Sequence, residues 1–105
     1  MNIKEIRNRN AKKLESGSKF GSHINCVHIN PSNSLEHERK KLDLCHALRV
    51  LGKDFYTETK FTNGTRADMY CLDDDIAYEI VCTEKEESII RKKTVYPCDV
   101  LVVKV

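Results

Sequence analysis

Two short turn signals divide the middle of the chain into three β-rich segments. Asn63-Gly64 separates residues 54–62 from residues 66–72, and a run of three aspartates separates the latter from residues 76–83. An Asn-Gly pair between two β-rich runs is a strong signal for a β-hairpin. Because turns this short join antiparallel strands, the three segments are predicted to be consecutive antiparallel strands.

Helical patterns lie on both sides of these strands. Within residues 34–52, apolar residues recur at helical spacing, at Leu35, Leu42, Cys45 and Leu48. Ser34 suits the N-cap of this helix, and Gly52 suits its end. Residues 84–96 are also predicted to be helical, and the apolar segment 99–105 follows as a strand. Since a helix connects this last strand to the one before it, those two strands are predicted to be parallel.

The predicted order from residue 34 onward is therefore helix, three strands, helix and strand. This order indicates an α/β fold, with helices packed on a mixed four-stranded sheet. A chain of 105 residues fits one domain. Residues 1–33 form a basic N-terminal extension, with six lysines and arginines against two glutamates in its first 19 residues. A short helix or a mobile arm is predicted before Gly17, and a short strand or extended piece at residues 23–29.

The composition indicates a compartment but no partner. No apolar run approaches the ~20 residues that a membrane span needs, and the start of the chain has no apolar core of the signal-peptide kind. Five cysteines, an odd number, fit a reducing compartment better than a disulfide framework. We therefore expect a cytoplasmic, intracellular protein with no membrane partner. A net charge of +2 is too small to indicate nucleic acid by itself.

Three acidic residues stand where carboxylates are uncommon. Asp68 and Glu79 lie inside neighbouring predicted strands, and Glu38 lies on the core-facing stripe of the first long helix. Like charges held close together need a cation, or one of them takes up a proton. Hard divalent ions such as Mg²⁺ or Mn²⁺ prefer oxygen ligands of this kind, and they assist phosphoryl chemistry. The alternative is that Asp68 pairs with Arg66 at a strand end and Glu79 faces water. The run 73–75 is interpreted as a solvated turn.

Short motifs around these acids resemble a known superfamily. The run Arg66-Ala67-Asp68, followed by Glu79-Ile80-Val81 and preceded by the helical segment 36–42, resembles the PD-(D/E)XK nuclease superfamily. The pattern is similar to archaeal Holliday-junction resolvases and to CoiA-like competence proteins. A Ser-His-Lys pattern on the helix of the latter is matched by Ser34, His37 and Lys40. The resemblance covers residues 34–105.

This resemblance implies a fold, an activity and a set of site residues. Residues 34–105 would be a restriction-endonuclease-like core of order αβββαβ, and the protein a metal-dependent DNA endonuclease, with structure-specific substrates as one option. Asp68, Glu79 and the backbone carbonyl of Ile80 would hold Mg²⁺ or Mn²⁺, and Glu38 would match the acid that some members carry on the first helix. Small resolvases of the superfamily act as dimers, and an apolar last strand has an edge to cover, so a homodimer is expected.

One position departs from the superfamily pattern. The superfamily has a lysine two residues after the second acid, where it orients the attacking water and offsets charge, and this chain has Val81 there. Lys60 or Lys85 could reach into the site with a long side chain. His37 or Lys41 could take the role from the helix. If nothing replaces the lysine, the chain is a catalytically degenerate nucleic-acid-binding module.

Positive side chains are candidates for contact with DNA phosphates. They are Arg66, Lys40, Lys41, Arg91, Lys92 and Lys93. A solvated helix face is the alternative for those on helices. A third class of function would use zinc at His23, Cys26 and His28, although their spacing matches no standard finger. The simpler interpretation is a strand with a buried Cys26, and the other four cysteines are predicted to be small core residues.

Overall fold

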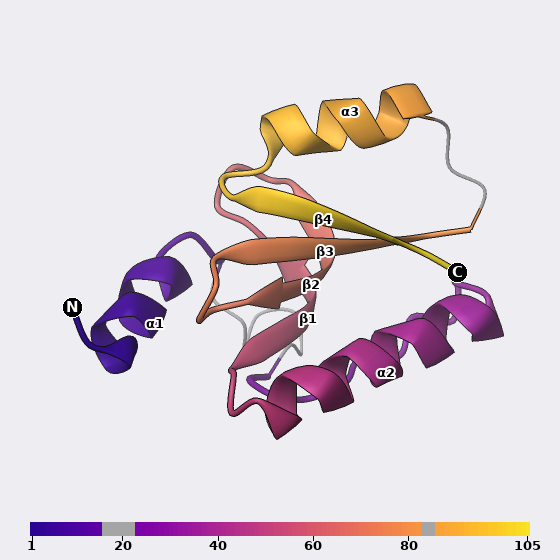
Figure 1. Cartoon of the computed structure of the whole chain (residues 1–105). Coiled ribbons are helices and arrows are strands. Elements are labelled where there is room, and N and C mark those ends of the chain that lie inside the picture. Colours follow the sequence, from indigo (N-terminus) through magenta and orange to yellow (C-terminus); the bar gives the residue numbers. More distant parts are fainter. Residues whose placement is uncertain (16–22, 83–85) are drawn as a thin grey trace.

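The structure is a computed structural model that describes residues 1–15, 23–82 and 86–105 (Figure 1). Its elements are α1 (Ile3–Ala11), α2 (Leu35–Val50), β1 (Phe55–Lys60), β2 (Arg66–Cys71), β3 (Ile76–Val81), α3 (Glu86–Val95) and β4 (Asp99–Lys104). The strands form one sheet in the order β1-β2-β3-β4. The predicted α/β class and the predicted element order from residue 34 onward are confirmed.

The connections between the strands set their directions. β1 with β2, and β2 with β3, pair antiparallel, whereas β3 pairs with β4 in parallel. Gly64 takes a φ of +90° in the first turn, a backbone conformation that glycine adopts without steric cost. Figure 1 shows that α3 crosses from the end of β3 back to the start of β4, and this crossover makes the last two strands parallel.

Helix α2 begins where the sequence predicts, but it buries a different face. The Ser34 hydroxyl caps the helix by accepting a hydrogen bond from the His37 N–H at 3.1 Å. Leu35 and Leu42, predicted to face the core, are 59% and 54% exposed. The buried positions include three polar residues, His37, Glu38 and Lys41. The predicted stripe was therefore wrong in part, because polar residues occupy three of the five buried positions of α2.

The hydrophobic core is divided between the two faces of the sheet. Between α2 and the sheet lie Cys45, Leu48, Phe55, Met69, Cys71 and Ile80. The opposite face packs Phe61, Ala67, Tyr70, Leu72 and Ala77, with Tyr96 and Val100 against them. Side chains alternate along β3, so Ile80 faces α2 while Ala77 and Glu79 face the other way.

The sheet is distorted at one place that concerns the acids. Backbone pairing between β2 and β3 runs from Cys71–Ile76 to Met69–Tyr78. Beyond it, the Ile80 N–H donates to the Asp68 side chain at 2.8 Å. Opposite Asp68 on β1, Glu58 has a φ of +47°, in the left-handed region that is uncommon for residues other than glycine. The carboxylate of Asp68 thus takes the place of a main-chain acceptor between two diverging strands.

The N-terminal extension folds against the sheet. Of the two alternatives for its first part, the helix is the one found, as α1. Arg7 pairs with Asp73 at 2.9 Å, and Lys13 pairs with Asp75 at 2.6 Å. Lys53 pairs with the remaining aspartate of the turn at 2.7 Å. Residues 73–75 form the predicted turn, with Asp74 exposed. The prediction that the turn is only solvated was wrong, because its three carboxylates form ion pairs with the N-terminal extension and with the α2–β1 connection.

Residues 23–30 run beside β1 without forming a strand. The Thr57 hydroxyl donates to the Cys26 carbonyl at 3.0 Å and accepts the His28 N–H at 2.8 Å. This side chain replaces part of a backbone ladder, so the segment is extended but irregular, and Cys26 is exposed. The predicted burial of Cys26 was wrong for this reason.

No helix in the described part of the chain is both long enough and apolar enough to span a bilayer.

Candidate functional site

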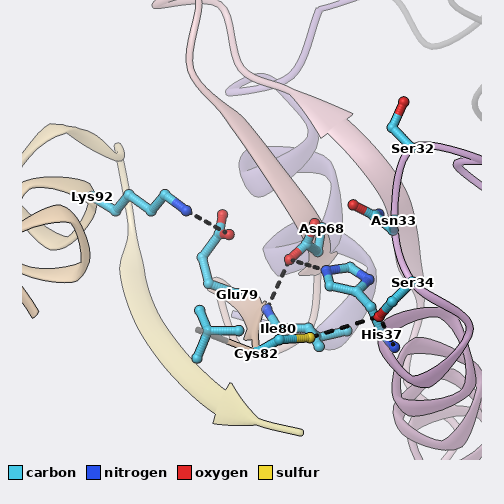
Figure 2. Close-up of a pocket in the computed structure, with 10 residues that line it drawn as sticks. Ser32, Asn33, Ser34, His37, Asp68, Glu79, Ile80, Cys82 and Lys92 are labelled. Carbon is cyan, nitrogen blue, oxygen red and sulfur yellow. Dashed lines mark hydrogen bonds and ion pairs between the residues drawn. The ribbon is translucent and has the colours of Figure 1, made fainter. Parts of the chain in front are cut away.

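A pocket of about 440 Å³ lies where β2 and β3 diverge (Figure 2). Its lining residues come from the turn before α2, from α2, β2, β3 and the end of β3, and from α3. They are Ser32, Asn33, Ser34, His37, Asp68, Glu79, Ile80, Val81, Cys82 and Lys92. The structure thus brings Asp68 and Glu79, the two strand acids singled out in the sequence, to one cavity.

The Asp68 carboxylate is fixed from two sides. Its Oδ2 atom accepts the Ile80 N–H at 2.8 Å and lies 3.3 Å from His37 Nε2. His37 is 8% exposed, so its ring has little freedom to move away. Figure 2 shows both contacts converging on the same oxygen. A backbone donor and a buried ring therefore hold Asp68 in one orientation at the pocket.

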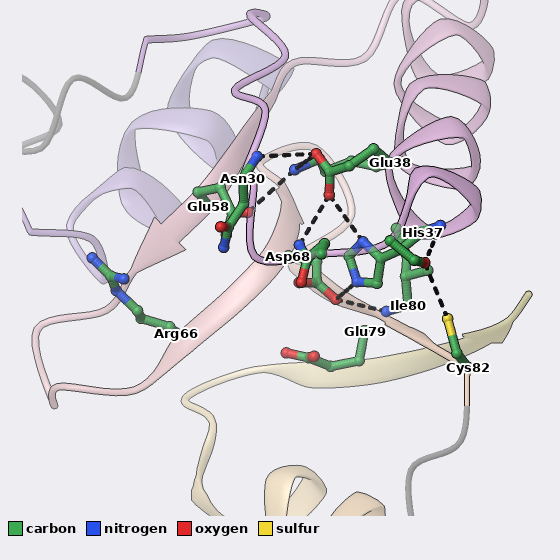
Figure 3. A network of polar contacts seen from close by, with 12 residues as sticks. Asn30, His37, Glu38, Glu58, Arg66, Asp68, Glu79, Ile80 and Cys82 are labelled. Carbon is green, nitrogen blue, oxygen red and sulfur yellow. Dashed lines mark hydrogen bonds and ion pairs between the residues drawn. The ribbon is translucent and has the colours of Figure 1, made fainter.

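A chain of charged groups lies behind the imidazole (Figure 3). His37 Nδ1 lies 3.0 Å from Glu38 Oε1, and Glu38 Oε2 lies 2.7 Å from Lys41 Nζ. Glu38 also accepts hydrogen bonds from the Asn30 backbone and the Asn33 side chain. Burial by itself raises the pKa of Glu38, but the hydrogen bonds from Lys41, Asn33 and Asn30 outweigh it and lower the pKa to about 2.

These contacts change the roles predicted for Glu38 and Lys41. Glu38 is absent from the pocket lining that the structure describes, and it contacts the lining residues His37 and Asn33 from behind. Lys41 is completely buried, with its ammonium bonded to Glu38, to Glu58 and to the His28 carbonyl. A lysine enclosed in this way cannot reach a nucleic-acid phosphate or the pocket. The predicted roles of Lys41, at the phosphate backbone or as the missing lysine, were therefore wrong.

Glu79 lies in a less favourable environment than Glu38. Its Oε1 accepts a hydrogen bond from the Tyr96 hydroxyl, and its Oε2 lies 3.4 Å from Lys92 Nζ. Burial, followed by the negative charge of Asp68, raises the pKa of Glu79 to about 7, against the opposing effects of Tyr96 and Lys92. The negative charges of Asp68 and Glu79 therefore repel each other across the pocket.

We expect Glu79→Gln to stabilise the protein at high pH in the presence of a chelator. The pKa of Glu79 is higher in the folded chain than the ~4.5 of an exposed glutamate, so its contribution to stability is complete below pH ~4.5 and is lost as the pH rises through ~7. Glutamine does not ionise and should escape this loss. The free energy of unfolding at pH 8 should rise by about 1–3 kcal/mol in Glu79→Gln, with little difference at pH 4.5.

Urea denaturation at both pH values measures this effect. Asp99→Asn is the matched control, because Asp99 is an exposed acid on the neighbouring strand β4 and its replacement removes the same charge. Equal pH profiles for the wild type and Glu79→Gln would contradict the assignment.

The types of side chain in the pocket limit which metal ions it could hold. Among the residues described, no three His, Cys, Asp or Glu side chains come together as a metal-binding group. Glu38 is therefore not a third ligand, and His23, Cys26 and His28 do not form a zinc site. Zinc takes three or four protein ligands, whereas Mg²⁺ binds through one or two carboxylates and keeps waters and substrate phosphates. Two carboxylates lining one pocket fit Mg²⁺ or Mn²⁺.

The other candidates for the missing lysine have different positions. Val81 lines the pocket with a buried apolar side chain. Lys60 lies 3.7 Å from Glu15 and is not part of the described pocket lining. Lys85 falls outside the residues that the structure describes. The remaining predicted phosphate contacts, Arg66, Lys40, Arg91 and Lys93, lie at least partly at the surface, and their contact with nucleic acid stays a prediction.

The contacts of Lys92 and Tyr96 with Glu79 were not predicted from the sequence. The sequence predicts Lys92 in a phosphate-binding patch on the helix surface and predicts no role for Tyr96. Ile89, Lys92 and Tyr96 follow each other at a spacing of three and four residues, and all three are partly buried. This spacing puts them on one side of the helix. It was the available signal that Lys92 faces the sheet.

One other cysteine departs from its predicted place in the core. Cys45 and Cys71 are buried as expected, Cys98 is partly buried and packs against the core, and Cys82 is exposed. Cys82 follows the last residue of β3, and its Sγ lies 3.7 Å from the Ser34 hydroxyl at the pocket. It is outside the core because the strand ends before it.

Comparison with known proteins yields no relative: no family model, no curated protein and no solved structure matches the chain. The class of the protein is therefore described from its own fold and pocket residues. It is an α/β protein with a mixed four-stranded sheet, and its pocket combines two acids, a histidine and a lysine.

Proposed function

We propose that the protein is a divalent-metal-dependent nuclease that hydrolyses phosphodiester bonds in DNA. The observation that carries this proposal is the meeting of Asp68 and Glu79, from adjacent strands, in one pocket beside His37 and Lys92. The order of elements from α2 to β4 agrees with a restriction-endonuclease-like core of the PD-(D/E)XK type. Positive charge next to paired carboxylates suits a site that takes a metal ion together with an anionic phosphate.

The ion would be held by Asp68, Glu79 and the backbone carbonyl of Ile80, and the preferred ions are Mg²⁺ and Mn²⁺. When bound, such an ion acidifies a water molecule and offsets negative charge on the phosphate. The protein prepares the ligands itself. His37 and the Ile80 N–H hold one oxygen of Asp68, and Tyr96 and Lys92 contact the two oxygens of Glu79. The carboxylates are thus oriented before any ligand arrives.

A nucleic-acid-binding module without catalysis is the second candidate. The observation that favours it is Val81, a buried apolar residue at the position where the superfamily has its lysine. In such a module the pocket would bind a phosphate without cutting the chain. Binding would be sensitive to salt and indifferent to divalent ions.

Two measurements on the wild-type protein test the proposal. Calorimetric titration with Mn²⁺ should give one saturable binding event per chain. Supercoiled plasmid and branched DNA should be cut with Mn²⁺ or Mg²⁺, and not with a chelator. Salt-sensitive DNA binding without cleavage or metal dependence would favour the binding module. The absence of any Mn²⁺ heat would overturn the nuclease proposal, even before a substrate is found.

His37→Ala should weaken Mn²⁺ binding by about 10- to 100-fold, because partners that orient a metal ligand are typically worth that much. The ring lies 3.3 Å from Asp68 and restrains it without being a ligand in this proposal. The measurement is the calorimetric dissociation constant. His46→Ala is the control, since His46 is exposed on the same helix. Unchanged affinity in His37→Ala would show that Asp68 needs no support from the ring.

A further inference from the structure

Val81 lines this pocket but carries no positive charge. Val81 lies two residues after Glu79 on β3, so both side chains point to the same face of the sheet. That face is packed by Tyr96 and Val100, which follow α3 in the chain. Any cation for this side of the pocket must therefore come from another element.

Helix α3 supplies one. Lys92 lines the pocket, and its Nζ lies 3.4 Å from Glu79 Oε2, which is a long contact for an ion pair. The Lys92 side chain is 28% exposed, so it is only partly covered where it lines the cavity. Figure 2 shows the side chain extending from α3 across β4 to Glu79.

The end of α3 is attached to the sheet next to this lysine. The Tyr96 hydroxyl is hydrogen-bonded to the Arg66 carbonyl and to Glu79, and the Asn63 side chain donates to the Val95 carbonyl at 3.0 Å. Tyr96 follows Lys92 by four residues, about one helical turn. These bonds anchor the end of α3 to β2, to β3 and to the turn between β1 and β2, within about one helical turn of Lys92.

We propose that Lys92 is the catalytic cation of this site and replaces, from α3, the lysine that β3 lacks at Val81. This inference rests on the proposed nuclease function. Lys92 then takes the role for which Lys60, Lys85, His37 and Lys41 were candidates.

The reaction defines what the ammonium does. The oxygen of a water molecule forms a bond to phosphorus, and the bond from phosphorus to the departing sugar oxygen breaks. One proton passes from the water to solvent, and the departing oxygen takes up one proton, so one water is consumed and no electrons are transferred. Negative charge on the non-bridging oxygens grows during this step, and the Lys92 ammonium donates hydrogen bonds to one of them. Removing one such donor typically costs about 10²–10³ in rate.

Lys92→Met tests this inference, with Lys12→Met as the matched control. Lys12 is exposed at the end of α1, is not among the candidate phosphate contacts, and loses the same charge on replacement. Cleavage of supercoiled plasmid in Mn²⁺ should fall about 100-fold or more in Lys92→Met and by less than about threefold in Lys12→Met. The double variant Lys92→Met/Val81→Lys should recover part of the lost rate, because it returns an ammonium to the same face of β3.

Two further measurements do not depend on turnover. Mn²⁺ affinity should be unchanged or tighter in Lys92→Met, since a cation next to Glu79 is removed. Binding of a labelled DNA duplex in Ca²⁺ should weaken about tenfold in Lys92→Met, remain close to wild type in Lys92→Arg, and change little in Lys12→Met. Urea denaturation of each variant separates loss of function from loss of folding, and Lys92→Arg supplies the test if Lys92→Met does not fold.

The outcomes separate this inference from the proposed function. If the wild type binds Mn²⁺ and cuts DNA while Lys92→Met cuts as well as Lys12→Met, the role of Lys92 is wrong and the nuclease remains. If the wild type binds no divalent ion, the nuclease and the role of Lys92 are both wrong. If the wild type binds DNA in Ca²⁺ and Lys92→Met binds it equally well, the ammonium does not contact the phosphate, and the inference is overturned.

Discussion

Replacing Asp68 by asparagine is expected to abolish the Mn²⁺ heat and to lower DNA cleavage by about 100-fold or more. Asparagine keeps the shape of the side chain and an oxygen acceptor for the Ile80 N–H, which Asp68 binds at 2.8 Å. It removes the negative charge that a hard divalent ion requires. The loss should therefore be in ion binding rather than in folding.

Removing this charge also has an effect on Glu79. The charge of Asp68 is one of the two causes that raise the pKa of Glu79, so that pKa should move down toward its ordinary value in Asp68→Asn. The measurements are calorimetry with Mn²⁺, plasmid cleavage and urea denaturation. Asp99→Asn on β4 is the control with the same loss of charge on an exposed residue. Full metal binding by Asp68→Asn would contradict the position of the ion between the two strands.

Glu38→Ala is expected to lower the free energy of unfolding by about 3–5 kcal/mol, the largest stability change among these variants. Lys41 is completely buried, and Glu38 lies 2.7 Å from its ammonium. Without Glu38, this buried cation retains Glu58 and the His28 carbonyl as partners, and it loses its shortest ion pair. A loss of this size is a large fraction of the stability of a small domain.

The same pair gives a pH dependence. The pKa of Glu38 is depressed in the folded protein, so its contribution to stability is present above pH ~4.5 and is lost as the pH falls toward ~2. Urea denaturation of the wild type at pH 7 and pH 3 should show this loss, and Glu38→Ala should show less of it. Glu36→Ala is the control, because Glu36 is an exposed acid in the same first turn of α2.

A double variant distinguishes the effect of an unpaired buried charge from the effect of lost side-chain packing. Glu38→Leu/Lys41→Met removes both charges and keeps the volume, so it should recover most of the stability that Glu38→Ala loses. A double variant that is as unstable as the single one would indicate that the side chains act by packing. An unchanged free energy of unfolding in Glu38→Ala would contradict the importance of the buried pair.

Local signals were sufficient for the order of the elements. The Asn63-Gly64 turn and the aspartate run 73–75 predicted three antiparallel strands, and the helical pattern before β4 predicted the parallel pair. They were also sufficient to predict that Asp68 and Glu79 approach each other, since neighbouring strands joined by a tight turn have few possible registers. Both residues line the same pocket.

These local patterns could not predict contacts between residues from distant segments of the chain. A hydrophobic stripe on α2 predicted Leu35 and Leu42 in the core, yet the helix buries Glu38 and Lys41 and leaves the leucines exposed. Burying a charged pair is favourable only if further groups complete it, and here Asn30, Asn33, Glu58 and the His28 carbonyl do so. Spacing within one helix does not contain that information.

The amino-acid sequence by itself determined the class of fold and the pair of strand acids, because turn residues and periodicity act over a few neighbouring positions. Only the tertiary structure decided that His37 restrains Asp68, that Lys41 is enclosed, and that Lys92 reaches Glu79. Each of these contacts joins separate elements. Long charged side chains can choose among several partners, and the packing of helices on the sheet selects the one they meet.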